Sequence, residues 1–280
     1  MGVFCRDFPL FLLSGRGMMT GKHKKGENDM DIQILQLIEG AKQARGLAVI
    51  IDVLRAFSLE CYLTQRGAAE LRPVRTLEEA FAWRQRDPSV LLVGERGGAK
   101  CEGFDYGNSP SSIPAEAVRG RRIIHSTSAG TQGLTQAVHA DERITGSLVN
   151  AAAVAAYIRA RDPETVSLVC MGNGGIREAA EDLLCAEYIR SLILMAPLPD
   201  IEERIRALQW HGGEHFFRPD TQEIYPEADF WLCTKRDLFP FVLRATEDEL
   251  GLRMEKVDLS DLCSAAAWGQ AALRTEKVEV

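Results

Sequence analysis

The sequence has no paired cysteine motif and no long apolar run. Its seven cysteines are scattered, odd in number and without a C-x-x-C pair, so they indicate neither a disulfide framework nor a zinc ribbon. No apolar stretch approaches the roughly 18 residues of a membrane span, and Phe8–Leu13 is too short for the core of a secretory signal. We therefore expect a cytoplasmic protein in a reducing compartment, with no membrane partner.

Basic residues are in the minority. The chain has 33 Lys and Arg against 40 Asp and Glu, a net charge of −7, so no overall field draws it towards nucleic acid or anionic lipid. An anionic ligand must therefore be captured by a local cluster. Hydrophobic residues make up 46% of the 280 residues, which predicts a folded globular protein.

From residue 46 onward, short β-branched apolar runs alternate with amphipathic stretches. This alternation is typical of an α/β fold, with a wound, largely parallel sheet and flanking helices. The predicted strands are Leu47–Ile51, Leu71–Val74, Val90–Val93, Arg122–His125, Arg143–Thr145 and Val166–Met171. The predicted helices are Arg55–Arg66, Leu77–Arg86, Thr131–His139, Ala151–Arg161 and Arg177–Met195, and Thr76 with Glu79 forms a capping-box pattern before the second of them.

Changes in composition divide the chain into three parts. Residues 1–30 have irregular apolar spacing and a basic run, which we interpret as a flexible N-terminal extension. Residues 31–196 are expected to form the α/β domain that carries most of the site. Residues 197–280 are interrupted by prolines and predict a smaller, more irregular α+β lobe, which includes a hairpin built from Phe239–Arg244 and Leu252–Val257.

In open α/β sheets, ligands bind outside the carboxyl ends of the strands, so the residues after each predicted strand are site candidates. Asp52 and Arg55 follow the first strand: the carboxylate suits a divalent cation or attack on phosphorus, and the guanidinium suits a phosphate, with a mutual salt bridge as the alternative. Glu95 and Arg96 repeat this pattern before a long Gly-rich loop that ends at Asn108–Pro110.

Two further loops complete the set. Ser126–Thr131 places hydroxyls and a glycine between a strand and a helix, which builds an oxyanion cradle or simply caps the helix. Glu181 and Asp182 lie in an acidic first turn, where they either face a metal or favour the helix dipole. At one rim of one sheet, these loops predict a site for a strongly anionic, phosphorylated small molecule with a divalent metal.

Together, these motifs resemble those of the 2-phosphosulfolactate phosphatase family. The resemblance is carried by Ile51–Ser58, Gly94–Gly97 with Gly103–Asp105, Asn108–Pro110, Ser126–Thr131 and Glu181–Ala186. It implies a Mg²⁺-dependent phosphatase that hydrolyses 2-phospho-3-sulfolactate to 3-sulfolactate and phosphate, on the route to coenzyme M.

Chemistry assigns roles to the residues on these motif positions. Asp52 and Asp182, helped by Glu181, are expected to hold Mg²⁺. In the alternative mechanism, Asp52 is the nucleophile and forms a phospho-aspartyl intermediate.

The remaining positions handle the substrate. Arg55 and Arg96 are expected to neutralise the phosphoryl and sulfonate groups, and Glu95 to act as general base or general acid. The residues expected to bind the substrate are Asn108, Ser109, Ser126, Thr127, Gly130 and Thr131.

Two other functions stay open: a phosphatase for a different phosphorylated organic acid, and a non-catalytic module that binds such a metabolite. Ala129 stands where the family usually has Asn, which bears on the substrate more than on the reaction. The carboxylates of Asp52 and Glu95 argue against a pure anion binder.

The aromatic residues between Trp210 and Trp231 either pack the second lobe, which we favour, or close over the site. We also expect a homodimer, from the frequency of such assemblies among soluble enzymes.

Overall fold

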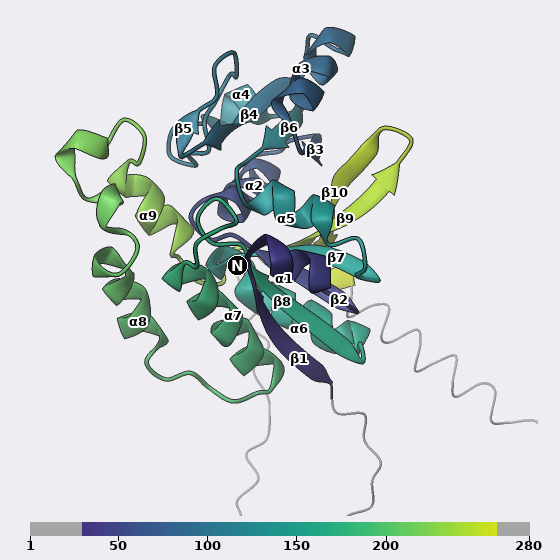
Figure 1. The fold of residues 1–280 in the computed structure, drawn as a ribbon, viewed down its shortest axis with the longest axis vertical. Helices are drawn as coiled ribbons and strands as arrows, with labels where there is room; N and C mark the ends of the chain where they lie inside the picture. Colours follow the sequence, from purple (N-terminus) through teal and green to yellow (C-terminus); the bar gives the residue numbers. More distant parts are fainter. Residues whose placement is uncertain (1–29, 262–280) are drawn as a thin grey trace, which may run out of the picture.

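The chain is organised around one ten-stranded sheet. A computed structural model describes residues 30–261, so the predicted extension of residues 1–30 lies, apart from Met30, outside the described residues. Figure 1 shows the sheet with helices around it, which confirms the predicted α/β fold with a largely parallel sheet. In spatial order the strands are β1 (Asp31–Gln36), β8 (Thr165–Cys170), β2 (Leu47–Ile51), β7 (Glu142–Gly146), β9 (Phe241–Asp248), β10 (Gly251–Asp258), β3 (Glu70–Pro73), β6 (Arg122–Ser126), β4 (Leu91–Arg96) and β5 (Ala99–Lys100).

An antiparallel hairpin joins two groups of parallel strands. The strands β1, β8, β2 and β7 are parallel, as are β3, β6 and β4, whereas β9 pairs antiparallel with β7 and β10 pairs antiparallel with β3. Figure 1 shows the first group in the lower part of the molecule and the second in the upper part. The hairpin was predicted from the sequence, but it is part of the central sheet. The division into two domains near residue 196 stays a prediction.

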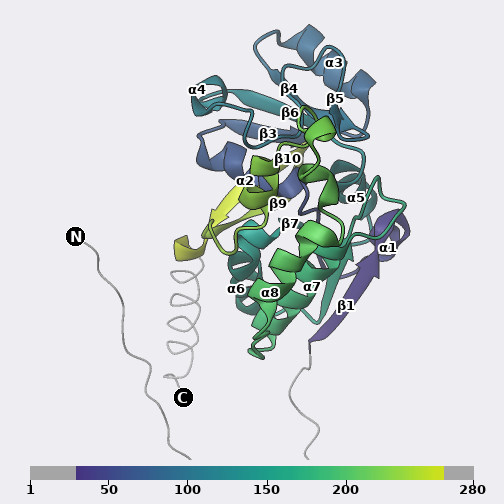
Figure 2. The ribbon, with the colours of Figure 1, turned by 90° about the vertical axis from the view of Figure 1, so that its left-hand side faces the viewer.

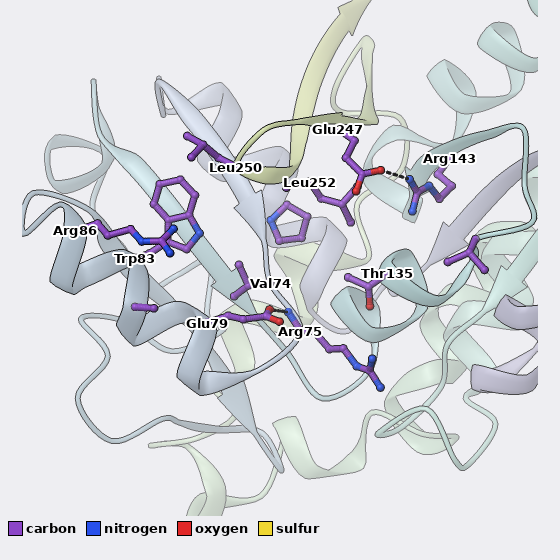
Figure 3. Close-up of a pocket in the computed structure, with 14 residues that line it drawn as sticks. Val74, Arg75, Glu79, Trp83, Arg86, Thr135, Arg143, Glu247, Leu250 and Leu252 are labelled. Carbon is purple, nitrogen blue, oxygen red and sulfur yellow. Dashed lines mark hydrogen bonds and ion pairs between the residues drawn. The ribbon is translucent and has the colours of Figure 1, made fainter.

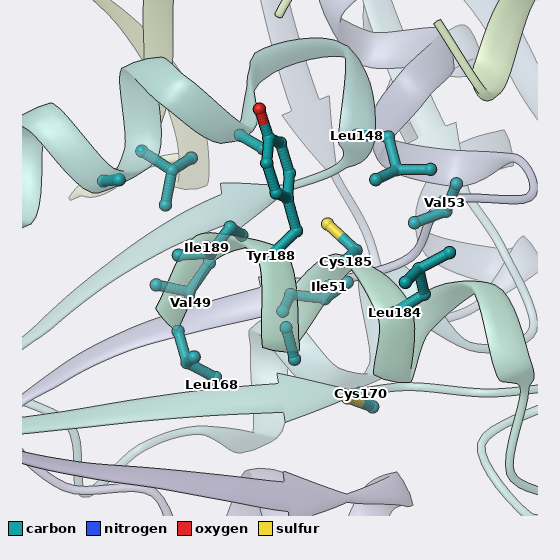
Figure 4. Close-up of a cluster of buried hydrophobic side chains, with 14 of the residues drawn as sticks. Val49, Ile51, Val53, Leu148, Leu168, Cys170, Leu184, Cys185, Tyr188 and Ile189 are labelled. Atoms are coloured by element: carbon teal, nitrogen blue, oxygen red, sulfur yellow. The ribbon is translucent and has the colours of Figure 1, made fainter. Parts of the chain in front are cut away.

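Strand β2 shows how the helices cover both faces of the sheet. All its residues are buried, and successive side chains point to opposite faces. Val49 and Ile51 belong to a core with α6 (Ala151–Arg161) and α7 (Ala180–Ile193), part of which is drawn in Figure 4. Ala48 and Ile50 belong to the opposite core, with α1 (Leu37–Gln43), α2 (Ala56–Gln65), α4 (Ala115–Val118) and α5 (Gly130–Gln136).

A smaller core lies under α3 (Leu77–Arg86), where Trp83 and Ala80 pack on β4 and β6. The helix has the bounds that the sequence predicts. Its capping box is confirmed, because Thr76 accepts from the Glu79 amide and the Glu79 carboxylate accepts from the Thr76 amide.

The chain after α7 forms a helical segment that packs against the sheet domain. It contains α8 (Ile201–Ala207) and α9 (Glu227–Cys233), and Figure 2 shows α8 beside α7. Phe216 and Phe230 are buried in the same core as α7, with ring centroids 6.1 Å apart. No helix between residues 30 and 261 is long and apolar enough to cross a membrane.

Candidate active site

A pocket of about 510 Å³ lies where loops from both strand groups meet. Four predicted site residues are in its wall: Asp52 and Arg55 after β2, Glu95 at the end of β4, and Asn108. The loops that follow β6 and β8 also contribute to the wall, as does the segment that contains Gly212 and Tyr225. The site is therefore at the carboxyl ends of strands of one sheet, as expected, and it draws on both groups of parallel strands.

Asp52 is the most perturbed carboxyl group in the pocket wall. Burial, and then the negative charges of Asp182 and Glu95, raise its pKa to about 8. Its Oδ1 accepts from the Ala56 amide at the start of α2 at 3.0 Å. A Cβ atom at Gly130 would lie 2.9 Å from its Oδ2, so the glycine lets the next loop approach this carboxyl group.

Glu95 is held by backbone groups on both sides of the pocket. Its Oε1 accepts from the Ser128 amide at 2.7 Å, and its Oε2 accepts from the Gly98 amide at 2.7 Å and from the Ser128 hydroxyl at 3.2 Å. These bonds connect the turn after β4 with the loop after β6. The carboxyl group is therefore fixed in position beside Asp52.

The Ser126–Thr131 loop directs its amides towards these carboxyl groups. Ser128 donates to Glu95, and the Gly130 amide bonds to Asp52. The Thr131 amide donates to the hydroxyl of Thr127, and the Thr127 amide donates to that of Thr131. The loop thus positions two acids, and its predicted role as an oxyanion cradle stays a prediction.

Arg55 is buried, and both terminal nitrogens of its guanidinium group donate hydrogen bonds to the protein. Its Nη1 donates to Asp229 Oδ2 at 2.8 Å and to the Ile224 carbonyl at 2.9 Å, and its Nη2 donates to the Gly98 carbonyl at 3.0 Å. The alternative considered from the sequence, a salt bridge between Arg55 and Asp52, is not formed, because Asp229 is the acid that pairs with Arg55. The other oxygen of Asp229 accepts from the Ser109 hydroxyl at 3.0 Å, so Ser109 belongs to this network.

The carboxyl group of Asp182, which is buried behind the pocket wall, joins the loop after β2 to the loop after β8. Its Oδ1 accepts from the Val53 amide and its Oδ2 from the Gly172 amide, both at 2.8 Å. Burial, and then the charge of Glu181, raise the pKa of Asp182 to about 8. Burial raises the pKa of Glu181 to about 7, with a further contribution from the charge of Asp52. The three predicted metal ligands therefore repel one another.

The other predicted residues lie around the pocket rather than in its wall. Arg96 donates to the Ser126 carbonyl at 3.1 Å and to its hydroxyl at 2.8 Å, and it lines neighbouring hollows. The residues placed around the wall in this way are Arg96, Ser109, Ser126, Thr127, Gly130, Thr131, Glu181 and Asp182. Their assignment to catalysis or binding stays a prediction.

Three titratable side chains in the wall were absent from the predicted set. Arg177 comes from the Gly-rich loop after β8. His215 and Tyr225 come from the aromatic segment for which packing was favoured over closing over the site, and these two residues line the pocket. Burial, and then the charge of Arg55, lower the pKa of His215 from its usual value, which favours the neutral ring. Tyr225 donates to the Gly97 carbonyl at 3.0 Å.

The arrangement of Asp52, Glu181 and Asp182 is compatible with a metal ion that takes only one or two ligands from the protein. Between residues 30 and 261, no group of three or more His, Cys, Asp and Glu side chains is arranged as a ligand cluster. Mg²⁺ commonly binds through one or two carboxylates and keeps water or phosphate oxygens as its other ligands. Asp52, Glu181 and Asp182 form no ion pair within the described residues, so their mutual repulsion is not relieved by a protein cation.

A second hollow, of about 540 Å³, lies between α3 and the tip of the β9–β10 hairpin (Figure 3). Trp83, Arg75 and the Arg143–Glu247 pair contribute to its lining. It holds none of the predicted site residues. The first pocket is therefore the candidate active site.

Comparisons with known proteins identify the same family as the motifs. Residues 32–248 match the family model described as 2-phosphosulpholactate phosphatase. A probable 2-phosphosulfolactate phosphatase from Caldicellulosiruptor saccharolyticus is 36% identical over 68% of this chain and 85% of the relative. Proteins with the same description from Thermotoga petrophila and Deinococcus radiodurans are 40% identical over 70% of this chain and 87% of the relative, and 42% identical over 53% and 62%.

Proposed function

This chain belongs to the 2-phosphosulfolactate phosphatase family, and we propose that it hydrolyses a phosphomonoester in the pocket around Asp52 and Glu95. The proposed reaction converts 2-phospho-3-sulfolactate and water into 3-sulfolactate and phosphate. The observation that carries the proposal is the pairing of two buried carboxyl groups with two arginines, Arg55 and Arg177, in one pocket. Family motifs supply the carboxyl groups and one of the arginines.

The pocket matches a small anion in size and in chemistry. Its volume lies in the range of small-molecule sites, and the substrate carries a phosphate, a sulfonate and a carboxylate. Arg55 has three bonds to the protein, which leave some of its N–H donors for a ligand. Arg177 is exposed at the rim, where its guanidinium can meet an incoming anion. We assign charge neutralisation to these two residues.

Two acids in the pocket support hydrolysis rather than binding alone. An anion gains nothing from Asp52 and Glu95 unless they move protons, attack phosphorus or hold a cation. In the first mechanism, Glu95 accepts the proton of a water that attacks phosphorus, and the P–O bond to the organic acid breaks. In the second, Asp52 attacks phosphorus as that bond breaks, and water then hydrolyses the phospho-aspartyl group to phosphate and free Asp52. In both, the leaving alkoxide takes a proton and departs as the hydroxy acid. Radiolabelled phosphate trapped on Asp52 in a single turnover supports the second mechanism, and its absence supports the first.

Asp52, with Glu181 and Asp182 behind it, would hold the Mg²⁺ ion in this proposal. When bound, Mg²⁺ neutralises phosphate charge and activates oxygen nucleophiles. Burial disfavours the ionised form of Asp52, and a bound cation would favour it. The homodimer and the cytoplasmic location expected from the sequence remain predictions.

Ala129 favours a second candidate substrate class, other phosphorylated organic acids. It lines the pocket at the position where the family usually has an amide side chain, so one polar contact to the ligand is missing. A substrate without the sulfonate needs fewer such contacts.

Phosphate release from a panel of esters tests the proposal. The panel contains 2-phospho-3-sulfolactate, phospholactate, phosphoglycolate and p-nitrophenyl phosphate, each with Mg²⁺ and with EDTA. We expect Mg²⁺-dependent turnover with a preference for the sulfonate. Preference for another ester moves the function to the second class, and no turnover of any ester by folded protein rejects the enzyme.

The variant Asp52→Asn locates the activity in the pocket. It is expected to lose at least 100-fold in kcat, the order of effect for an essential catalytic group. Asp141→Asn, which changes an exposed aspartate, is the matched control and is expected to keep full activity.

A further inference from the structure

A buried imidazole connects the pocket residue Asn108 to an acid on α2. His125 lies on β6 and is fully buried. Its Nε2 is 3.0 Å from Asn108 Oδ1, and its Nδ1 is 2.8 Å from Glu60 Oε1. Neither Glu60 nor His125 was a predicted site residue. The sequence does contain a signal for Glu60, because it is a lone acid in the apolar helical stretch Ala56–Leu63.

Whether Nε2 of His125 carries a proton determines whether the oxygen or the nitrogen of the Asn108 amide faces the ring. Oδ1 accepts hydrogen bonds only, so the observed contact requires a proton on Nε2 of His125. The amide nitrogen of Asn108 has no acceptor among the described residues, and Asn108 lines the pocket. The carboxamide therefore presents its N–H donors to the ligand space.

Two states of the Glu60–His125 pair give this contact. Glu60 faces Nδ1, and the pair holds the Nε2 proton either as an ionised Glu60 with an imidazolium or as a protonated Glu60 with a neutral Nε2–H imidazole. If the pair loses one proton, Nε2 becomes an acceptor. The Asn108 amide would then turn over and present an oxygen, which repels phosphate and sulfonate.

The buried pair of Glu60 and His125 is not expected to stabilise the folded protein. Glu60 is fully buried, and its Oε2 has no hydrogen-bond partner within the described residues. Burying a carboxyl group with one oxygen unsatisfied is unfavourable, and apolar residues often replace buried ion pairs without loss of stability. Its retention next to a pocket residue is better explained by a role in that pocket.

We propose that Glu60 and His125 are positioning residues that hold the Asn108 amide as a hydrogen-bond donor to the anionic group of the substrate. This inference rests on the proposed phosphatase function. It assigns substrate recognition to Asn108 and assigns no direct contact with the substrate to the other two residues.

Kinetics of matched variants test the coupling. Asn108→Ala removes the donor and is expected to raise KM about 10-fold, the size of one hydrogen bond to a charged group, with a smaller change in kcat. Glu60→Leu removes the control of the ring proton and is expected to raise KM to a similar extent. Glu60→Gln restores KM to near the wild-type value, because its amide donates to Nδ1 and keeps the Nε2–H form of the ring.

The double variant separates positioning from a structural role. If Glu60 acts through Asn108, Glu60→Leu has no further effect on KM in the Asn108→Ala background. Additive effects, or an unchanged KM in folded Glu60→Leu, overturn the proposal.

Two measurements keep the test independent of activity. ¹⁵N NMR of the wild-type imidazole is expected to show a protonated Nε2 on His125, and an unprotonated Nε2 overturns the proposal even if a variant fails to fold. If the wild-type protein turns over none of the esters, the proposed function fails. The same comparison of variants is then made with the Kd of inorganic phosphate, and equal affinities for wild type and Asn108→Ala overturn the inference.

Discussion

Replacement of Asp52 by asparagine is expected to stabilise the metal-free protein at alkaline pH. The folded-state pKa of Asp52 is about 8, against 3.8 for an exposed aspartate, so the folded protein retains a proton that the unfolded chain releases. The stabilisation from this proton is complete below pH 3.8 and is lost as the pH rises through about 8. Asparagine is neutral at every pH and avoids that loss.

The expected magnitude follows from two opposing effects. A pKa change of one unit corresponds to about 1.4 kcal/mol, and removal of one of several interacting carboxylates recovers only part of the total, about 2–4 kcal/mol at pH 8.5. Asparagine keeps an acceptor for the Ala56 amide but loses the one for Gly130, which costs about 1 kcal/mol. We expect a net gain of about 1–3 kcal/mol and a rise in Tm of about 3–10 °C.

Thermal unfolding in EDTA at pH 5 and at pH 8.5 measures this effect. The gain in Tm should appear at pH 8.5 and be small or reversed at pH 5, and Asp141→Asn should change Tm at neither pH. Equal changes at the two pH values, or a loss of stability at pH 8.5, would refute the assignment of Asp52 as a buried carboxyl group whose ionised form is destabilised.

Three further predictions concern the surroundings of the pocket. Asp229→Asn leaves the buried Arg55 without its partner and is expected to lower the free energy of unfolding by about 3 kcal/mol in urea, whereas a loss below about 1 kcal/mol would show that the pair is not needed. Arg177→Gln should raise KM for the phosphorylated substrate about 10-fold with kcat within about twofold; a fall in kcat alone would place Arg177 in the chemical step. Thr76→Ala should lower stability by about 1 kcal/mol without changing KM, measured by urea unfolding and steady-state kinetics, and unchanged stability would contradict the contribution of the capping box.

The sequence predicted elements well where local chemistry specifies them. Leu47–Ile51, Leu77–Arg86 and Ala151–Arg161 have the predicted bounds, because their apolar pattern and flanking residues agree with one structure. It missed β1 (Asp31–Gln36), an edge strand with half-exposed residues and little apolar contrast. It also could not place the β9–β10 hairpin between two groups of strands, because that position depends on pairing with distant residues.

In the site, too, local sequence predicted some features, and contacts between distant residues determined the others. Asp52, Arg55, Glu95 and Asn108, which line the pocket, could be selected from the sequence because they lie at or after strand ends and carry motif chemistry. Which acid pairs with Arg55 was beyond local reasoning, because Asp229 is far away in the sequence and reaches it only through the packing of α9. His215 and Tyr225 likewise reach the pocket by tertiary packing.

The most direct test of the central claim is phosphate release from 2-phospho-3-sulfolactate by the full chain before EDTA, after EDTA and after Mg²⁺ is restored, beside Asp52→Asn. We predict turnover that EDTA abolishes and Mg²⁺ restores in the wild type, and at least a 100-fold lower kcat in the variant. Full turnover by folded Asp52→Asn would contradict the account, because it would place the chemistry outside this pocket.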